Sequence, residues 1–194
     1  MRCAVFTATP RGTKTALRVR ASLDASVDIF VKAGQEMPAE VRVYKRLAPQ
    51  VEAAFRQYDA LVFIMATGIA VRMIAGSLKS KLEDPAVLVL DEEAQHVISL
   101  LSGHIGGANE LTRELAASLG ADPVITTATD VQKKLAVDVA AARLALRPSP
   151  KEQIKRFNSA VLDDAAIRYV IDENLARASF YKKRLDDMGL AAVF

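Results

Sequence analysis

The sequence contains very few of the residues that proteins use to bind metal ions or to cross-link a fold. Of its 194 residues, one is a cysteine, Cys3, and two are histidines, His96 and His104. A single cysteine excludes an internal disulfide and a cysteine-based zinc site. The two histidines form no HxxxH or HExxH pattern. We therefore expect no metal and no other cofactor bound by the protein itself.

Long uncharged segments and dense basic clusters are also absent. No stretch reaches the roughly 18 to 20 apolar residues of a membrane-spanning helix, and the first apolar run is too short for a signal peptide. We therefore expect a cytoplasmic protein with no membrane partner. The sequence pI is about 9.0, but there is no tryptophan and no run of five basic residues. Nucleic acid is therefore not expected as a partner.

The remaining composition, 51% hydrophobic and 25% charged residues, is typical of a globular fold. The charge is uneven, since residues 59–130 hold four Lys/Arg and ten Asp/Glu, a net charge of −6. Apolar runs alternate with segments of helical spacing, and the run at residues 60–66 is typical of a central parallel strand. This pattern predicts an α/β fold, an open, mostly parallel twisted sheet with helices on both faces, plus a small C-terminal α/β subdomain.

Individual elements follow from the same patterns. Strands are expected at residues 2–8, 27–31, 41–44, 60–66, 87–90, 96–101 and 123–127, with a hairpin turn at 91–94. Helices are expected from Pro10 to about Leu23, from Pro49, after a cap at Thr67 and Gly68, at 108–119 before Gly120, and from Val131 to about Leu146 after a cap at Thr129 and Asp130. Pro148 and Pro150 break the last of these helices. Two more helices, 151–160 and 174–188, and strands at 167–171 and 191–194 would complete the chain. We expect an N-terminal domain over 1–130 and a linker helix with a small middle subdomain over 131–194.

Three loops share one design, in which an apolar strand ends, a short Gly/Ser/Thr loop follows and a helix begins. They lie at residues 66–68, 102–107 and 126–130. In an open α/β sheet, ligands bind beyond the carboxyl ends of the strands, where helix N-termini offer N–H groups to anions. We therefore expect the loops to approach a ligand that carries carboxylates or phosphates. The glycines fit neither GxGxxG nor a P-loop, which disfavours dinucleotides and P-loop chemistry.

Each of these features also has a purely structural interpretation. Glycines often only turn a chain, Thr67 and Asp130 could be helix caps, and Glu110 could only favour a helix dipole. His104 lies among small residues at a strand end, and the ordinary pKa of histidine, ~6.5, suits proton transfer. His96 lies in an expected hairpin strand and is interpreted as structural. Ser102 has only weak support as a nucleophile because GxSxG is absent.

Four segments carry a resemblance to a known family: FIMATGIAVRMIA, LKSKLEDPAVLVLDE, VISLLSGHIGGANEL and PVITTATD. Over about residues 58–130 the sequence resembles the cobalamin biosynthesis CbiG family of cobalt-precorrin-5A hydrolases, and residues 131–158 look like the start of that family's middle region. The resemblance implies an enzyme of anaerobic cobalamin biosynthesis. Such an enzyme opens the δ-lactone of cobalt-precorrin-5A with water, releases acetaldehyde and yields cobalt-precorrin-5B. The cobalt belongs to the corrinoid tetrapyrrole substrate.

Roles can be suggested from residue chemistry within the matched segments. His104 is expected to act as general base or acid, with Glu110 orienting it or sharing the proton. The residues expected to bind substrate or its oxyanion are Thr67, Gly68, Arg72, Ser102, Gly103, Gly106, Gly107, Asn109, Thr127 and Thr129. Because family members are longer, we expect a separately encoded C-terminal domain as partner, and a homodimer stays open. The alternatives are a non-catalytic tetrapyrrole-binding subunit and a sugar- or nucleotide-binding regulator of the same fold class.

Overall fold

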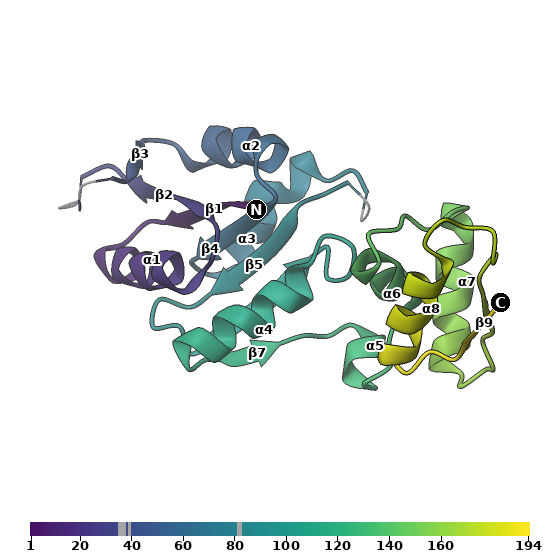
Figure 1. The fold of residues 1–194 in the computed structure, drawn as a ribbon. Coiled ribbons are helices and arrows are strands. Elements are labelled where there is room, and N and C mark those ends of the chain that lie inside the picture. Colours follow the sequence, from purple (N-terminus) through teal and green to yellow (C-terminus); the bar gives the residue numbers. More distant parts are fainter. Residues whose placement is uncertain (35–37, 39, 81–82) are drawn as a thin grey trace. The chain divides into compact units, whose positions relative to one another are not determined.

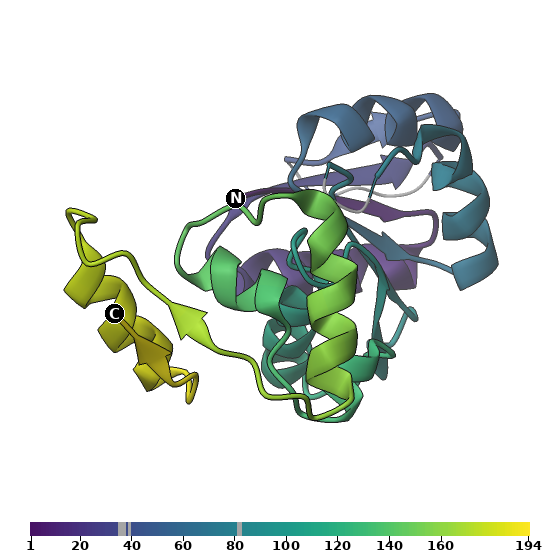
Figure 2. The same cartoon turned by 90° about the vertical axis from the view of Figure 1, so that its right-hand side faces the viewer.

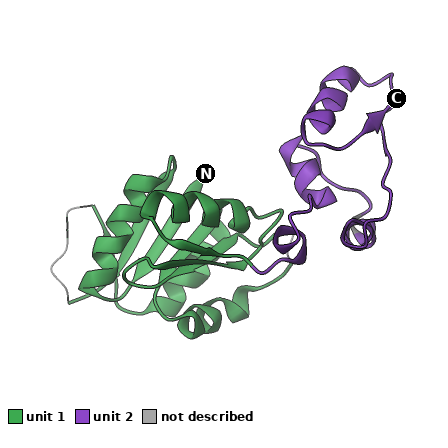
Figure 3. Cartoon of the chain, turned by 90° about the horizontal axis from the view of Figure 1, so that it is seen from below, with its two compact units in different colours: residues 1–125 green, residues 126–194 purple. Residues whose placement is uncertain are grey.

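The computed structural model describes residues 1–34, 38, 40–80 and 83–194 of the chain. The chain forms two compact units, Met1–Ile125 and Thr126–Phe194, which Figure 3 distinguishes by colour. None of the helices within the described residues is long and apolar enough to cross a bilayer.

A seven-stranded sheet forms the centre of the first unit (Figure 1). Its strands are β1 (Arg2–Thr7), β2 (Ser26–Lys32), β3 (Arg42–Tyr44), β4 (Ala60–Ile64), β5 (Ala86–Leu90), β6 (His96–Leu101) and β7 (Asp122–Val124), in the spatial order β3-β2-β1-β4-β5-β6-β7. The first five strands of that order run parallel. The hairpin expected at residues 91–94 is confirmed, so β6 runs antiparallel to β5, and β7 runs parallel to β6. The sheet is therefore mostly parallel, as expected.

Helices cover both faces of this sheet. The helices are α1 (Pro10–Ser22), α2 (Leu47–Gln57), α3 (Thr67–Ile74), which continues into the short 3-10 helix η1 (Ala75–Ser77), and α4 (Ala108–Leu119). Buried residues of α1 and α4 share one hydrophobic cluster, and those of α2 and α3 share the other. The α/β fold predicted from the sequence is confirmed.

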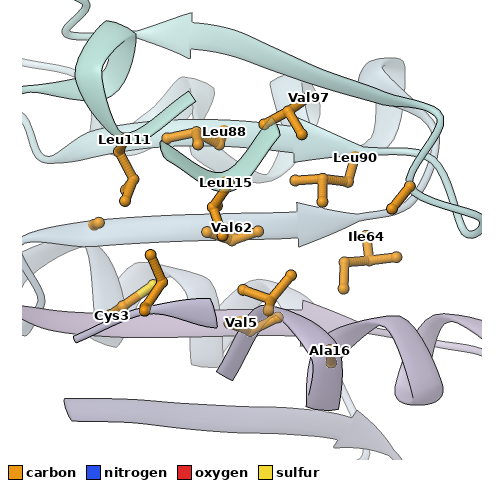
Figure 4. Packing of buried hydrophobic residues seen from close by; sticks show 14 of the residues in the cluster. Cys3, Val5, Ala16, Val62, Ile64, Leu88, Leu90, Val97, Leu111 and Leu115 are labelled. Atoms are coloured by element: carbon orange, nitrogen blue, oxygen red, sulfur yellow. The ribbon is translucent and has the colours of Figure 1, made fainter. Parts of the chain in front are cut away.

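The two faces follow from the alternation of side chains along the buried strands. In β1 and β4, Val5 and Val62 join the cluster with α1 and α4, whereas Phe6 and Phe63 join the cluster with α2 and α3. Figure 4 shows Val5, Val62 and Leu115 of α4 within the first cluster. A strand buried on both faces needs apolar residues at every position, which is why residues 60–66 read as a continuous apolar run.

Two helix ends agree closely with the sequence, whereas the caps predicted at Thr67 and at Thr129 and Asp130 are wrong. The Thr9 side chain accepts a hydrogen bond from the Gly12 N–H at the start of α1, and Gly120, with φ +70°, ends α4. The expectation that Thr67 caps α3 is wrong, because Thr67 is the first helical residue and Ala66 occupies the capping position. Likewise α2 begins at Leu47, two residues before Pro49.

The second unit contains four helices and two short strands among its described residues. They are α5 (Ala128–Val131), α6 (Val137–Arg143), α7 (Lys151–Leu162), β8 (Tyr169–Val170), α8 (Ala178–Asp187) and β9 (Ala192–Val193), with β8 and β9 paired in parallel. Figure 2 shows β8 as the short arrow that follows α7. Pro148 and Pro150 separate α6 from α7.

One expected helix, Val131 to about Leu146, is wrong. The chain forms the separate helices α5 and α6, because Lys133 adopts a left-handed φ of +56° and the Lys134 N–H bonds the Thr129 carbonyl, which closes α5. Asn158 of α7 then accepts a hydrogen bond from the Val137 N–H at the start of α6. The cap for this helix therefore comes from a residue 21 positions away, which local sequence cannot reveal. The expected strand at 123–127 is also shorter, since β7 ends at Val124.

Candidate active site

The direction of β6 separates the loops that were expected to gather at one edge. The loop at 66–68 follows β4 and lies at the edge where β1, β4 and β5 end, which we call the carboxyl edge. Because β6 is antiparallel to β5, residues 102–107, the glycine loop, lie at the opposite edge, beside the start of β5. There, a Cβ added to Gly106 would lie 3.4 Å from the Asp84 carbonyl oxygen. The expectation of a common edge is therefore wrong for these two loops.

A cavity of about 370 Å³ opens at the carboxyl edge. It lies beyond the carboxyl ends of β4 and β5, and ligands of open α/β sheets bind outside the carboxyl ends of strands. We call it the carboxyl-edge pocket, and its lining comes from the β4–α3 loop and the β5–β6 hairpin. The lining residues are Met65, Ala66, Thr67, Val89, Asp91, Glu92, His96 and Ile98.

Asp91 holds the hairpin turn that borders this pocket. Its side chain accepts hydrogen bonds from the backbone N–H groups of Glu93 (3.0 Å), Gln95 (3.1 Å) and His96 (2.7 Å). Partial burial raises the pKa of Asp91, but these backbone donors lower it by more, so its pKa lies below the ordinary value. The same carboxylate lies 3.5 Å from Nδ1 of His96. A charged carboxylate therefore stands beside the imidazole at neutral pH.

Glu92, the second acid of the pocket, is fixed by α1. The Thr9 hydroxyl donates to Oε1 of Glu92 over 2.5 Å, and the Thr15 hydroxyl donates to the Glu92 carbonyl, also over 2.5 Å. The neighbouring Glu93 pairs with Arg11 at 3.2 Å. A carboxylate at the N-terminus of α1 is favoured by the helix dipole. Acidic side chains of the hairpin therefore already occupy the start of α1.

Thr67, Gly68 and Arg72 stay together at the carboxyl edge. Thr67 lines the pocket, and Nη1 of Arg72 donates to the Gly68 carbonyl over 3.0 Å. The guanidinium is thereby folded back along α3 toward the helix start. Arg72 thus brings a positive charge back to the start of α3, where Thr67 lines the pocket.

Close internal packing accounts for the glycines of the glycine loop. A Cβ on Gly103 would lie 2.7 Å from Oδ1 of Asn109, and a Cβ on Gly106 would lie 2.8 Å from the Ser102 carbonyl oxygen. Gly107 has a φ of +82°, which favours glycine. Ser102 itself adopts φ +58°, and its buried hydroxyl has no hydrogen-bond partner among the described residues. The loop therefore needs small residues to close on itself.

Several N–H groups at the start of α4 are used within the loop. The Ala108 and Asn109 N–H groups bond the carbonyls of Ser102 and Gly103, and the Gly107 N–H bonds the carbonyl of His104. The Asn109 side chain is buried and accepts a hydrogen bond from the Ser99 hydroxyl over 2.7 Å. These bonds leave fewer of the expected backbone donors for a substrate anion.

Glu110 and His104 lie at this second edge. Oε2 of Glu110 pairs with Nη1 of Arg113 at 3.2 Å, and 74% of the Glu110 side chain is exposed. His104 is partly buried. The ion pair with Arg113 therefore holds Glu110, the acid in the first turn of α4, on the exposed surface of the helix.

Thr127 and Thr129 belong to the second unit. Thr127 precedes α5, and its hydroxyl donates to Oδ2 of Asp130 over 2.6 Å. Thr129 is buried, and its carbonyl accepts the bond that closes α5. Within this unit, Thr127 stabilises the start of α5 and Thr129 stabilises its end.

Sequence reasoning missed Asp91, Glu92 and His96. The hairpin was predicted correctly, but its turn was interpreted only as a connection. The available signal was position, because residues that directly follow a buried parallel strand lie at its carboxyl edge. Within the described part of the chain, no group of three or more His, Cys, Asp or Glu side chains could hold a metal ion.

Comparison with known proteins finds a family that part of this chain resembles. Residues 49–130 match the model described as Cobalamin synthesis G N-terminal. The chain is 50% identical over 146 residues to the cobalt-precorrin-5A hydrolase of Salmonella typhimurium, covering 75% of this chain and 41% of that protein. It is 49% identical over 116 residues to the cobalt-precorrin-5A hydrolase of Priestia megaterium, covering 60% of this chain and 31% of that protein. It therefore spans less than half the length of these curated relatives.

A solved structure agrees with the sequence matches. The crystal structure of a cobalamin biosynthesis protein G homolog from Sulfolobus solfataricus superimposes with a TM-score of 0.55 at 27% identity, covering 91% of this chain and 51% of that one. Residues 49–130 of the chain are therefore similar to the cobalamin synthesis G N-terminal family.

Proposed function

We propose that this chain provides the N-terminal part of a cobalt-precorrin-5A hydrolase, an enzyme of cobalamin biosynthesis. The observation that carries the proposal is the 50% identity, over 146 residues, to a curated relative of that name. Identity at this level over most of the chain is far more specific than fold likeness, which alone would fit many functions.

The proposed reaction is hydrolysis of a cyclic ester on a cobalt-containing tetrapyrrole. Water attacks the lactone carbonyl and the ring C–O bond breaks, which gives an acid and an alcohol. The alcohol then loses its O–H proton, its C–C bond to the macrocycle breaks, the two-carbon fragment leaves as acetaldehyde, and the macrocycle takes up a proton. The cobalt arrives with the substrate. Such a reaction needs a group that takes a proton from water, a group that protonates the leaving oxygen, and donors for the developing oxyanion.

Anionic arms of the macrocycle have to be held outside the acidic pocket. Residues 59–130 carry a net charge of −6, so attraction must come from local positive groups. Arg72 and the N-terminus of α3 at Thr67 and Gly68 supply such groups at the carboxyl edge. This arrangement supports their predicted role in substrate binding.

The other residue roles remain predictions. They are proton transfer by His104 with Glu110, and substrate contacts by Ser102, Gly103, Gly106, Gly107, Asn109, Thr127 and Thr129. A separately encoded C-terminal domain as partner, a homodimer and a cytoplasmic location are likewise proposals. The rival function, a non-catalytic tetrapyrrole-binding subunit, is not favoured, because the curated relatives are named as hydrolases.

The test is anaerobic incubation of cobalt-precorrin-5A with this chain alone, and with this chain plus the C-terminal part of the Salmonella relative. Acetaldehyde and the mass of the corrinoid product are measured. Release in either reaction, absent from heat-denatured controls, supports the proposal. Corrinoid binding without acetaldehyde release in both reactions would favour the binding subunit. Absence of both corrinoid binding and acetaldehyde release would contradict both functions.

A further inference from the structure

We infer that the carboxyl-edge pocket is the lactone-opening site and that His96, positioned by Asp91, performs its proton transfers. This inference rests on the proposed hydrolase function and deepens it. It moves the reacting centre from the glycine loop to the opposite edge of the sheet.

The backbone places His96 with precision at this edge. It is the first residue of β6, and its N–H bonds Asp91 over 2.7 Å across the hairpin turn. Because strand side chains alternate, His96 points to the same face as Ile98, and both line the pocket with Met65. The imidazole is therefore directed by a short hairpin whose turn is fixed by three hydrogen bonds.

The carboxylate also sets the chemistry of the ring. With Asp91 Oδ2 at 3.5 Å from Nδ1, the proton of a neutral imidazole is favoured on Nδ1, which leaves Nε2 as the proton acceptor. Such contacts often shorten when substrate excludes water. About half of the His96 side chain is exposed (53%), so substrate and water can reach it.

The pocket selects an uncharged group. Its walls are apolar at Met65, Val89 and Ile98, and its charged lining residues are the acids Asp91 and Glu92. A carboxylate arm would be repelled there, whereas a neutral cyclic ester would not. A volume of about 370 Å³ suits one edge of a macrocycle, with its anionic arms left outside near Arg72.

The reaction then balances without another reactant. His96 Nε2 takes one proton from water as the water oxygen bonds the lactone carbonyl carbon. The tetrahedral intermediate collapses, the ring C–O bond breaks, and the same proton passes from Nε2 to the leaving oxygen. The products of this step are an acid and an alcohol. The Thr67 hydroxyl is the polar uncharged side chain of the lining and is suited to hydrogen-bond the carbonyl oxygen.

The glycine loop offers less for this chemistry. Its glycines are explained by contacts with Ser102 and Asn109, and Glu110 pairs with Arg113. The role of His96 can therefore be tested separately from that of the glycine loop.

The experiment compares His96→Gln with Arg56→Gln, a control on α2 where Arg56 pairs with Glu52, in whichever preparation releases acetaldehyde. We expect His96→Gln to lower kcat by ~10²- to 10⁴-fold with corrinoid binding unchanged, and Arg56→Gln to stay within about threefold. Circular dichroism confirms that both variants are folded. Activity of His96→Gln within about threefold of the parent overturns the inference while the hydrolase function stands. If no preparation of the parent chain releases acetaldehyde, the hydrolase function and this inference are overturned together.

Asp91 is proposed as a positioning residue, so its variant needs another readout. Asp91→Asn keeps an oxygen for the turn but removes the charge, and we expect kcat to fall about tenfold with KM unchanged. The split between kcat and KM separates this role from a structural one, because a loosened turn would also raise KM. An unchanged kcat, or a rise in KM as large as the fall in kcat, would overturn the role of Asp91.

Discussion

The Thr9 hydroxyl donates a 2.5 Å hydrogen bond to Glu92, although the two residues lie 83 positions apart in the chain. The same Thr9 oxygen accepts the Gly12 N–H and so caps α1. One hydroxyl therefore ties the first β–α turn to the hairpin that borders the pocket.

Replacement of Thr9 by alanine should reduce the stability of the first unit. Both the cap and the bond to Glu92 would be lost, and we expect the free energy of unfolding to fall by ~1 to 2 kcal/mol. Thr9→Ser keeps the hydroxyl and should recover most of this loss. Urea unfolding followed by circular dichroism measures the difference, and equal midpoints for the alanine variant and the parent would contradict the cap.

Asp91→Ala should destabilise the protein in a pH-dependent manner. The folded-state pKa of Asp91 is lowered from 3.8, so its contribution is fully present above that ordinary value and is lost as pH falls below it through the folded-state value. We expect a loss on the order of 1 to 2 kcal/mol at pH 7 from the broken backbone hydrogen bonds. The gap in unfolding free energy between parent and variant should narrow in acid. A gap that widened as the pH fell would be inconsistent with the lowered pKa.

Gly106→Ala should damage the glycine loop. The new Cβ would lie 2.4 Å from the Ser102 Cβ and 2.8 Å from the Ser102 carbonyl oxygen, so the backbone must move. We expect a loss of ~2 to 3 kcal/mol. Gly76→Ala is the matched control, because a Cβ there has no neighbour within 4 Å among the described residues, and its effect should stay within about 0.5 kcal/mol. Thermal unfolding of the two variants provides the comparison.

Arg72→Gln should weaken substrate binding more than it slows the chemical step. Loss of an exposed positive charge at the start of α3 should raise KM about 3- to 10-fold, with a smaller effect at high salt. Arg56→Gln is the control, because Arg56 pairs with Glu52 on α2. A tenfold fall in kcat at unchanged KM would instead place Arg72 at the reacting atoms.

The sequence predicted best those elements whose signals are local. The strand predicted at residues 60–66, the cap at Thr9 and the ending at Gly120 each depend on neighbouring residues. The structure confirms the cap and the ending, and it confirms the strand over Ala60–Ile64. The break between α5 and α6 depends on Asn158, which lies in another helix, and so no local pattern could reveal it.

The candidate site was harder to predict, because its residues meet only through strand direction. Thr67 and Ser102 follow similar apolar strands in the sequence, yet the antiparallel pairing of β6 places them at opposite edges. The hairpin itself was foreseen from residues 91–94. Such a hairpin reverses the direction of β6, and this reversal places His96 and the glycine loop at opposite edges.

The length of β6 also limits the energetic coupling between substitutions at the carboxyl edge and substitutions at the opposite edge, where the glycine loop lies. Six residues separate the two edges, a span of about 20 Å, which exceeds the 7 to 10 Å over which substitutions usually couple. Changes at His96 and changes in the glycine loop should therefore add in free energy. The two ends of the sheet can then diverge independently, so one end can be redesigned for a different ligand while the other keeps its stability.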